Sequence, residues 1–300
     1  MRSLDLPDEP DKPGQAERAN DGGRDQPRPD PRELPDPDER GRAYEAIRAY
    51  FSDQAALRAE DRRDGHCTPA YRDEVSGFFK EWTDHLRRWP EKPRAAADRP
   101  ADPPETREAI SRLRDAEPTF SADARAIEQE NKDKYGGWLE GFDHRLKGED
   151  RLGEKVAEKL KAEARTTATA AIREIGDAIR YTFCLQPGNY TKGYYDVKER
   201  FESRGYEMYY SHNWWTNPEY KGVNTRWVAS DGQRFEVQFH TPDSFHAKHH
   251  MTHIAYQRIR DPATSRAELS ELHAFQREVS SRVQVPDSAV DIPDYRKEGF

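Results

Sequence analysis

Two extended segments joined by Asp231-Gly232 constrain the fold of this chain more than any other feature. Residues 225–230 and 233–241 are rich in β-branched and aromatic side chains, and an Asp-Gly step between two such segments signals a tight β-hairpin. Apolar and polar residues alternate in the second segment, with Phe235, Val237 and Phe239 set against Glu236, Gln238 and His240. Because successive strand residues point to opposite faces, the pattern predicts one core face and one polar face.

The segments around this hairpin predict an α+β domain. Further strands are expected over residues 178–185 and 206–213, where β-branched and aromatic residues gather. Helical periodicity predicts helices over 151–162, 166–174, 192–203, 243–258 and 263–281. From this order we expect a mixed β-sheet of about four to five strands covered by helices, in a domain over residues 135–285 with a tail at 286–300.

A polar leader and a helical region precede this domain. Residues 1–40 are mainly Pro, Asp, Arg and Gly, which bury too little apolar surface to offset the entropy of ordering, so a disordered leader is expected. Residues 41–134 show helical spacing of apolar side chains, and helices are expected at 105–115 and, after an N-cap at Ser121, at 122–134. The sequence does not distinguish three roles for this region: a cap, an oligomerisation surface and a binding site for a neutralising partner.

Composition excludes several classes of protein. The formal net charge of -8 argues against a protein that coats nucleic acid, which needs a basic surface. Cys67 and Cys184 fit neither a zinc motif nor a disulfide framework, and are expected to be reduced thiols. No segment approaches the roughly 20 apolar residues of a membrane helix, and the start lacks a signal-like apolar run. We expect a cytoplasmic protein, with export that uses no cleaved signal left open.

Two carboxylates are candidates for a metal site. Glu236 lies on the polar face of its strand, and Asp177 immediately precedes the strand expected at 178–185. Carboxylates that converge from adjacent strands form the oxygen-rich site that Mg²⁺ prefers, a common device in phosphoryl transfer. The competing interpretation is a solvated polar face, as on many hairpin strands.

A basic segment lies upstream of both carboxylates. It gathers four cations within eleven residues: Arg145, Lys147, Arg151 and Lys155. A triphosphate needs several cations at once, and arginine contacts phosphate oxygens through a fork of donors. The alternative is an exposed helix with ion pairs to Glu149, Asp150 and Glu154.

Four motifs in a fixed order carry a family resemblance. The basic segment is followed by Asp177-Ala178-Ile179-Arg180, then Tyr220-Lys221-Gly222-Val223-Asn224-Thr225, then Glu236-Val237-Gln238-Phe239-His240-Thr241. The series resembles the synthetase domain of the RelA/SpoT family, whose enzymes make alarmones by moving pyrophosphate from ATP to a nucleotide 3′-hydroxyl. The resemblance implies a nucleotidyltransferase-like fold for residues 135–285. Arg151 stands in the position of a family Ser, Asn224 in that of a His and His240 in that of an Arg. These departures resemble the divergent actinobacterial and toxin-like branch of small alarmone synthetases.

The resemblance implies a role for each site residue. Asp177 and Glu236 would hold Mg²⁺, and Glu236 would accept the proton of the attacking hydroxyl. The ATP phosphates would be bound by Arg145, Lys147, Arg151 and Lys155. The acceptor would be bound by Tyr220, stacked on its base, and by Asn224, Gln238 and His240.

The resemblance also implies a reaction. ATP would be the donor and a purine nucleotide the acceptor, giving a (p)ppApp- or (p)ppGpp-type product, with a growth-inhibiting toxin as one use of such an enzyme. The hydrolase signature of the family is absent, so synthesis alone is expected. Two alternatives stay open: transfer of pyrophosphate to the 3′ end of tRNA, and an inactive domain that senses nucleotides or a protein partner. A homo-oligomer is also open.

Other clusters receive a plainer interpretation. Four histidines lie along one side of the expected 243–258 helix: His246, His249, His250 and His253. Without a Cys or HExxH context they are not expected to bind metal. His246, Lys248 and His250 are expected near the phosphates or at the sheet's end. Trp214-Trp215 and Tyr209-Tyr210 are expected to pack in the core, with base stacking by Trp214-Trp215 as the alternative.

Overall fold

The computed structural model describes residues 101–300 except Ala164 and Ala263, and these belong to one compact unit. The expected leader, Cys67 and most of the 41–134 region lie outside the described residues. Within the described part, no helix has the length and apolar character needed to cross a membrane.

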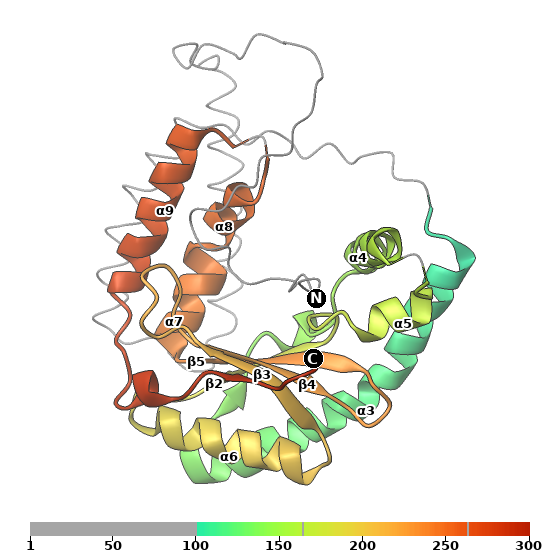
Figure 1. The fold of residues 1–300 in the computed structure, drawn as a ribbon. Helices are drawn as coiled ribbons and strands as arrows, with labels where there is room; N and C mark the ends of the chain where they lie inside the picture. Colours follow the sequence, from blue (N-terminus) through green and yellow to red (C-terminus); the bar gives the residue numbers. More distant parts are fainter. Residues whose placement is uncertain (1–100, 164, 263) are drawn as a thin grey trace. The chain divides into compact units, whose positions relative to one another are not determined.

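The centre of the fold is a six-stranded sheet in the order β1-β2-β5-β4-β3-β6 (Figure 1). Its strands are β1 (Trp138–Leu139), β2 (Arg180–Cys184), β3 (Glu207–Asn213), β4 (Val223–Val228), β5 (Arg234–His240) and β6 (Tyr295–Arg296). β2 and β5 are parallel, and the remaining pairs are antiparallel. The prediction of an α+β domain with a mixed sheet is therefore confirmed. The short edge strands β1 and β6 bring the count above the expected range, and β6 lies in the expected tail.

The β4–β5 hairpin forms as its turn residues predict. Gly232 has φ 88°, a conformation that side chains with a Cβ rarely adopt. Asp231 Oδ1 accepts a hydrogen bond from the Gln233 amide at 3.0 Å and holds the turn. The hairpin pairs Arg226 with Glu236, which fixes the register of the polar face.

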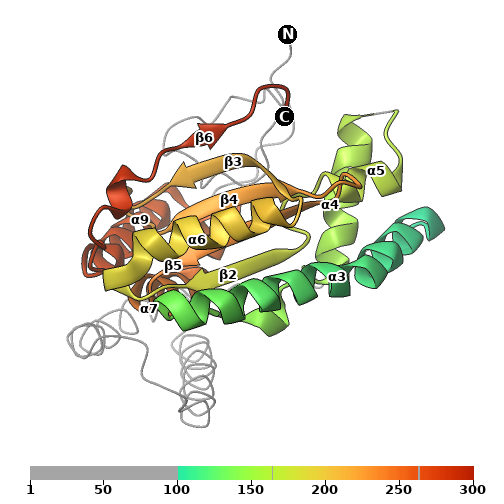
Figure 2. The ribbon, with the colours of Figure 1, turned by 90° about the horizontal axis from the view of Figure 1, so that it is seen from below.

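One face of the sheet is covered by α3 (Pro104–Tyr135) and α6 (Tyr190–Ser203), which lie side by side across it (Figure 2). The apolar faces of the strands meet these helices. Fully buried aromatic rings dominate the layer: Tyr181, Phe183, Tyr194, Phe201, Trp227, Phe235 and Phe239. Phe235 contacts Phe120 of α3 at 5.6 Å and Phe201 of α6 at 5.7 Å between ring centroids. Each fully buried ring contributes roughly 1.5–3 kcal/mol of transfer free energy.

The break expected in α3 at Ser121 is wrong. The helix runs through Pro118 without interruption, and Ser121 caps nothing. Proline in a helix interior removes one hydrogen bond and costs about 3 kcal/mol. Apolar residues on both sides of it share one buried face, and their burial offsets that cost: Ile110, Leu113, Phe120, Ala124 and Ile127. Since α3 packs on the sheet, the core includes residues before 135.

The opposite face of the sheet has helices at its two sides (Figure 1). On one side stand α4 (Glu149–Ala162) and α5 (Ala168–Arg173). On the other stand α7 (Pro242–His246), α8 (His253–Ile259) and α9 (Arg266–Ser281). The single helix expected over 243–258 is interrupted by η3, a π turn at Ala247–Met251. Short 3₁₀ turns occur at Phe142–His144, Pro187–Asn189 and Ala289–Asp291.

Candidate active site

The polar face of the sheet forms rows of side chains that cross neighbouring strands. The first row places Glu236 of β5 between Arg180 of β2 and Arg226 of β4. Directly paired residues on adjacent strands point to the same side, so this row sets one carboxylate between two cations. The row continues to Tyr210 of β3, whose ring centroid lies 5.1 Å from the Arg226 guanidinium carbon.

Glu236 is buried and oriented by its neighbour on the same strand. Glu236 is only 8% exposed. Gln238 Nε2 donates to Glu236 Oε1 at 3.0 Å, and Lys248 Nζ in turn donates to Gln238 Oε1. Gln238 supplies a hydrogen bond to this buried side chain, and Arg180 and Arg226 flank it in the row.

Asp177 lies in the turn before β2 and is bound by two lysines. Lys147 Nζ lies 2.7 Å from Asp177 Oδ2, and Lys155 Nζ of α4 donates to Asp177 Oδ1 at 3.0 Å. The segment bearing Lys147 runs beside the start of β2, where the Lys147 amide donates to the Ala178 carbonyl at 3.0 Å. Burial alone raises the pKa of Asp177, but Lys147 and Lys155 outweigh it and hold that pKa well below its usual range.

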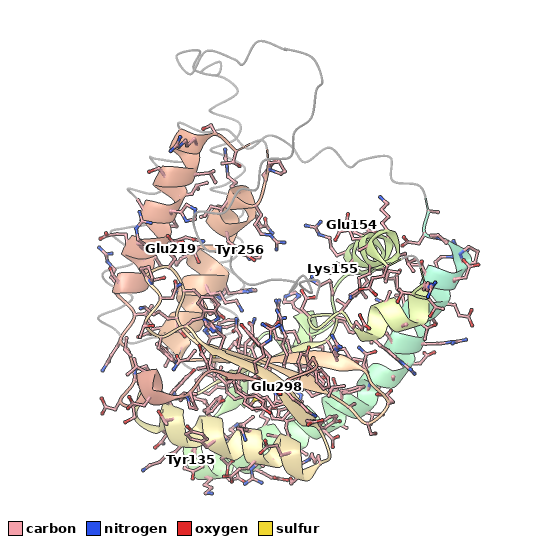
Figure 3. The ribbon with its side chains drawn as sticks, viewed as in Figure 1. Tyr135, Glu154, Lys155, Glu219, Tyr256 and Glu298 are labelled. Carbon is pink, nitrogen blue, oxygen red and sulfur yellow. The ribbon has the colours of Figure 1, made fainter. Side chains whose placement is uncertain are left out.

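The turn that carries Asp177 approaches the row that contains Glu236. A Cβ added at Gly176, the residue before Asp177, would lie 3.3 Å from the Tyr209 hydroxyl and 3.5 Å from Arg226 Cδ. Arg226 is the residue paired with Glu236, so the turn borders the same part of the polar face. Lys155 on α4 and Tyr256 on α8 stand at the two sides of this region (Figure 3).

The carboxylates are compatible with magnesium. Mg²⁺ is usually held by one or two carboxylates together with substrate phosphates and water, rather than by a cage of protein ligands. Asp177 and Glu236 supply that donor type. In the part of the chain that the structure describes, no group of three or more His, Cys, Asp or Glu residues could hold a metal, and this includes the described histidines of α7, η3 and α8.

Arg145 contacts the core rather than the two carboxylates. Its Nε donates to Glu117 Oε1 at 2.6 Å and its second terminal nitrogen to Glu117 Oε2 at 3.1 Å. Nε also donates to Ser121 Oγ at 2.9 Å, and the guanidinium carbon lies 4.5 Å from the Phe142 ring centroid. The Glu117 side chain is 3% exposed. Arg145 is thus committed to a forked, largely buried ion pair with α3.

Arg151 lies on the outer surface of α4. Its guanidinium is 2.6 Å from Glu154 Oε2, and the two side chains are 51% and 41% exposed. This is the exposed i,i+3 pair that the alternative interpretation of the basic segment foresaw. Of the four cations expected to bind phosphates, the structure brings Lys147 and Lys155 to Asp177 and leaves Arg145 and Arg151 elsewhere.

Tyr220 is held at the site by a chain of side chains. Its hydroxyl donates to Asn224 Oδ1 at 2.8 Å and lies 3.1 Å from His240 Nε2, while His240 Nδ1 lies 2.9 Å from Ser244 Oγ. His240 is fully buried, and burial, with Lys248 next, lowers its pKa well below the usual value. The buried His240 ring therefore supports the Tyr220 hydroxyl from the core side. Tyr220 and Asn224 are both half-buried, so a ligand can contact them.

Position 222 requires glycine because it lies directly before β4 and close against the end of β5. Its φ is 151°, and a Cβ there would lie 2.8 Å from the Phe239 carbonyl oxygen and 2.9 Å from His240 Cε1. A larger residue at this position would displace His240 or the strand.

Two residues of the site, Arg180 and Arg226, have no role in the sequence predictions. Arg180 nonetheless lies in one of the matched motifs. Arg226 lies two residues after Asn224 on an alternating strand, and this parity places both on one face. Lys248, expected near the phosphates or at the sheet's end, is brought to Gln238 by the π turn, which no local pattern predicts. Burial, followed by Arg180, lowers the pKa of Lys248 to about 7.

The remaining aromatic predictions divide by face. Trp215 is 1% exposed and packs edge-on against Tyr190 in the core, as expected. Trp214 and Tyr210 are half-buried. Tyr210 lies on the polar face of the sheet, whereas Tyr209 is buried at a bulge of β3 and stacks on Phe300 at 5.0 Å.

Comparisons with known proteins give only remote likenesses. No protein-family model matches the chain, and no curated protein matches it. Among solved structures, it is similar to the Type VI effector Tas1 in complex with its immunity protein (18% identity, 61% of this chain and 98% of that one, TM-score 0.42). It is also similar to the small alarmone synthetase 1 from Bacillus subtilis bound to its product pppGpp (14%, 68% and 92%, 0.38). A GTP pyrophosphokinase family protein from Streptococcus pneumoniae is a further likeness (11%, 67% and 89%, 0.35).

Proposed function

We propose that the protein transfers pyrophosphate from ATP to the 3′-hydroxyl of a purine nucleotide. One observation carries the proposal: buried Glu236 stands between Arg180 and Arg226 on neighbouring strands, and Asp177 with its two lysines lies in the turn that leads into the strand of Arg180. A carboxylate base among fixed cations suits the transfer of an anionic group to a hydroxyl. The order of the four sequence motifs supports the same reaction.

The reaction balances as a displacement at phosphorus. The acceptor's 3′-oxygen attacks the β-phosphorus of ATP, and the bond from that phosphorus to the oxygen bridging the α- and β-phosphates breaks. AMP leaves with the bonding electron pair, and the hydroxyl proton passes to the Glu236 carboxylate. No covalent enzyme intermediate is required, so the protein contributes position and charge.

Each cluster of the site has a part in this scheme. Lys147 and Lys155, which both contact Asp177, would bind the donor phosphates. Arg180 and Arg226 neutralise charge on the migrating group on either side of Glu236. Mg²⁺, held by Asp177 and Glu236, would neutralise phosphate oxygens. The half-buried ring of Tyr220 offers a stacking surface to the acceptor base.

The test is transfer of label from γ-³²P ATP with Mg²⁺ to AMP, ADP, ATP, GDP, GTP or bulk tRNA in separate reactions. The parent protein should label at least one purine mononucleotide, and a Glu236→Gln variant should be slower by about 10³-fold, because it cannot accept the proton. A Glu154→Gln variant, which alters an exposed carboxylate on α4, is the matched control and should retain parent activity.

The outcomes separate the alternatives. Label on tRNA alone would replace the nucleotide acceptor by an RNA 3′ end, and label on no acceptor would leave the sensor interpretation. Growth arrest on expression of the parent, with normal growth for Glu236→Gln, would show that the product acts as a toxin.

A further inference from the structure

A relay of two hydrogen bonds leads from η3 to Glu236. Lys248 Nζ donates to Gln238 Oε1, and Gln238 Nε2 donates to Glu236 Oε1 at 3.0 Å. Gln238 is 5% exposed and Lys248 is half-buried. The relay therefore runs through a covered part of the site, where hydrogen bonds are stronger than in water.

Two hydrogen bonds from the buried residue Thr252 stabilise the π turn that carries Lys248. The Thr252 amide donates to the Ala247 carbonyl at 2.9 Å, the i→i+5 bond that widens this turn, and Thr252 Oγ1 donates to the same carbonyl at 3.1 Å. Thr252 is 6% exposed. π turns inside helices occur often at functional sites. Here the turn separates α7 from α8 and presents Lys248 to the end of β5.

Gln238 needs such a partner because its amide is ambiguous. A glutamine side chain can turn either its oxygen or its NH₂ group toward a neighbour, and only the NH₂ group attracts a carboxylate. A lysine ammonium donates hydrogen bonds and cannot accept them, so it is compatible with only one of these orientations. With Lys248 on Oε1, Nε2 must face Glu236, which leaves Glu236 Oε2 to the reaction.

We propose that Lys248 is a positioning residue that orients Glu236 through Gln238. The inference rests on the proposed function only for the role of Glu236. Burial and Arg180 lower the pKa of Lys248 to about 7, and Glu236 opposes them, so the ammonium stands close to the charges of the site. None of the residues matched to the alarmone synthetase motifs is a lysine of η3.

A double-mutant cycle tests whether Lys248 acts through Gln238. Lys248→Met should lower kcat by about 30-fold with KM for ATP within about threefold of the parent, since position and not substrate binding is lost. Gln238→Met should lower kcat comparably. The double variant should be no slower than the slower single variant within about threefold, because the second change removes a link that is already broken. Lys248→Arg, which retains a donor, should recover most of the loss.

Two outcomes of the cycle would overturn the proposal. Multiplicative losses would show that Lys248 and Gln238 act independently. A tenfold or larger rise in KM for ATP in Lys248→Met would make Lys248 a phosphate ligand instead. Lys198→Met, which removes a lysine paired with Glu202 on α6 at the other face of the sheet, is the control and should match the parent.

A second measurement needs no activity. The side-chain amide of Gln238, assigned in ¹⁵N spectra by its disappearance in Gln238→Met, should exchange slowly with water in the parent. It should exchange at least about tenfold faster in Lys248→Met and not in Lys198→Met, because the amide gains freedom to turn. Unchanged exchange in Lys248→Met would sink the proposal. An inactive parent with the expected exchange would instead count against the proposed function alone.

Discussion

Cations of one short segment, residues 145–155, form two ion-pair clusters that differ in how many cations share each carboxylate. Arg145 meets Glu117, a single carboxylate at 3% exposure, through two nitrogens, and its Nε also donates to Ser121. Lys147 and Lys155 share Asp177, so two ammonium groups face one carboxylate at 15% exposure. The first cluster sets one cation on a carboxylate within the core, whereas the second sets two ammonium groups on one more exposed carboxylate.

The difference shows how a charged segment divides between fold and function. A forked ion pair inside a core fixes a helix against a loop, and either partner left alone is a buried uncompensated charge. Ammonium groups that compete for one carboxylate can exchange it for a phosphate oxygen at little cost. Under the proposed function, we therefore assign phosphate recognition to Lys147 and Lys155, while Arg145 anchors α3.

The largest expected effect is on stability, in Arg145→Met. The change leaves Glu117 charged and nearly inaccessible on α3, and should lower the free energy of unfolding by about 3 kcal/mol, measured as a urea transition. Lys155→Met is the matched comparison and should lower it by less than about 1 kcal/mol, because Asp177 keeps Lys147. Equal losses in the two variants would erase the distinction between the clusters.

The second prediction concerns activity in Lys155→Met. Removing one of the two ammonium groups at Asp177 should lower kcat/KM for ATP by about 100-fold, because the proposed function assigns both groups to the donor phosphates. Circular dichroism and the urea midpoint should stay near those of the parent. A loss below about threefold would show that the lysines serve Asp177 alone.

The sequence predicted the strands better than the partners of the charged residues. Alternation along β5 and the Asp231-Gly232 turn specify strand, face and register locally, and the structure confirms them. The pair Arg145–Glu117 joins residues 28 positions apart and depends on α3 running through Pro118, where local rules predict a break. Lys248 reaches Gln238 only because a π turn replaces part of the expected helix. Tertiary packing, rather than local propensity, decided each of these.

The third prediction is a pH dependence carried by Asp177. Its pKa is lowered in the folded protein, so the stabilisation is present above the usual aspartate value of about 4 and is lost as the pH falls below it. The stability advantage of the parent over Asp177→Asn should therefore shrink steadily between about pH 5 and pH 2.5. Glu117, whose pKa is also lowered, is present in both proteins, so its contribution cancels. An advantage independent of pH would mean that the lysines do not act on Asp177 by charge.

The smallest effect is expected at Arg151, one of the four cations that the family resemblance assigns to the ATP phosphates. Arg151 is 51% exposed and paired with Glu154 one turn along α4, and such exposed pairs contribute little because water screens them. Arg151→Met should change the free energy of unfolding by less than about 0.5 kcal/mol and KM for ATP by less than about threefold. Lys155 lies four residues further along the same helix. Arg151→Met and Lys155→Met therefore differ mainly in that only Lys155 contacts Asp177. A tenfold rise in KM would instead show that Arg151 leaves Glu154 for the donor phosphates, and the charge available to a ligand would then include an exposed arginine as well as the lysines at Asp177.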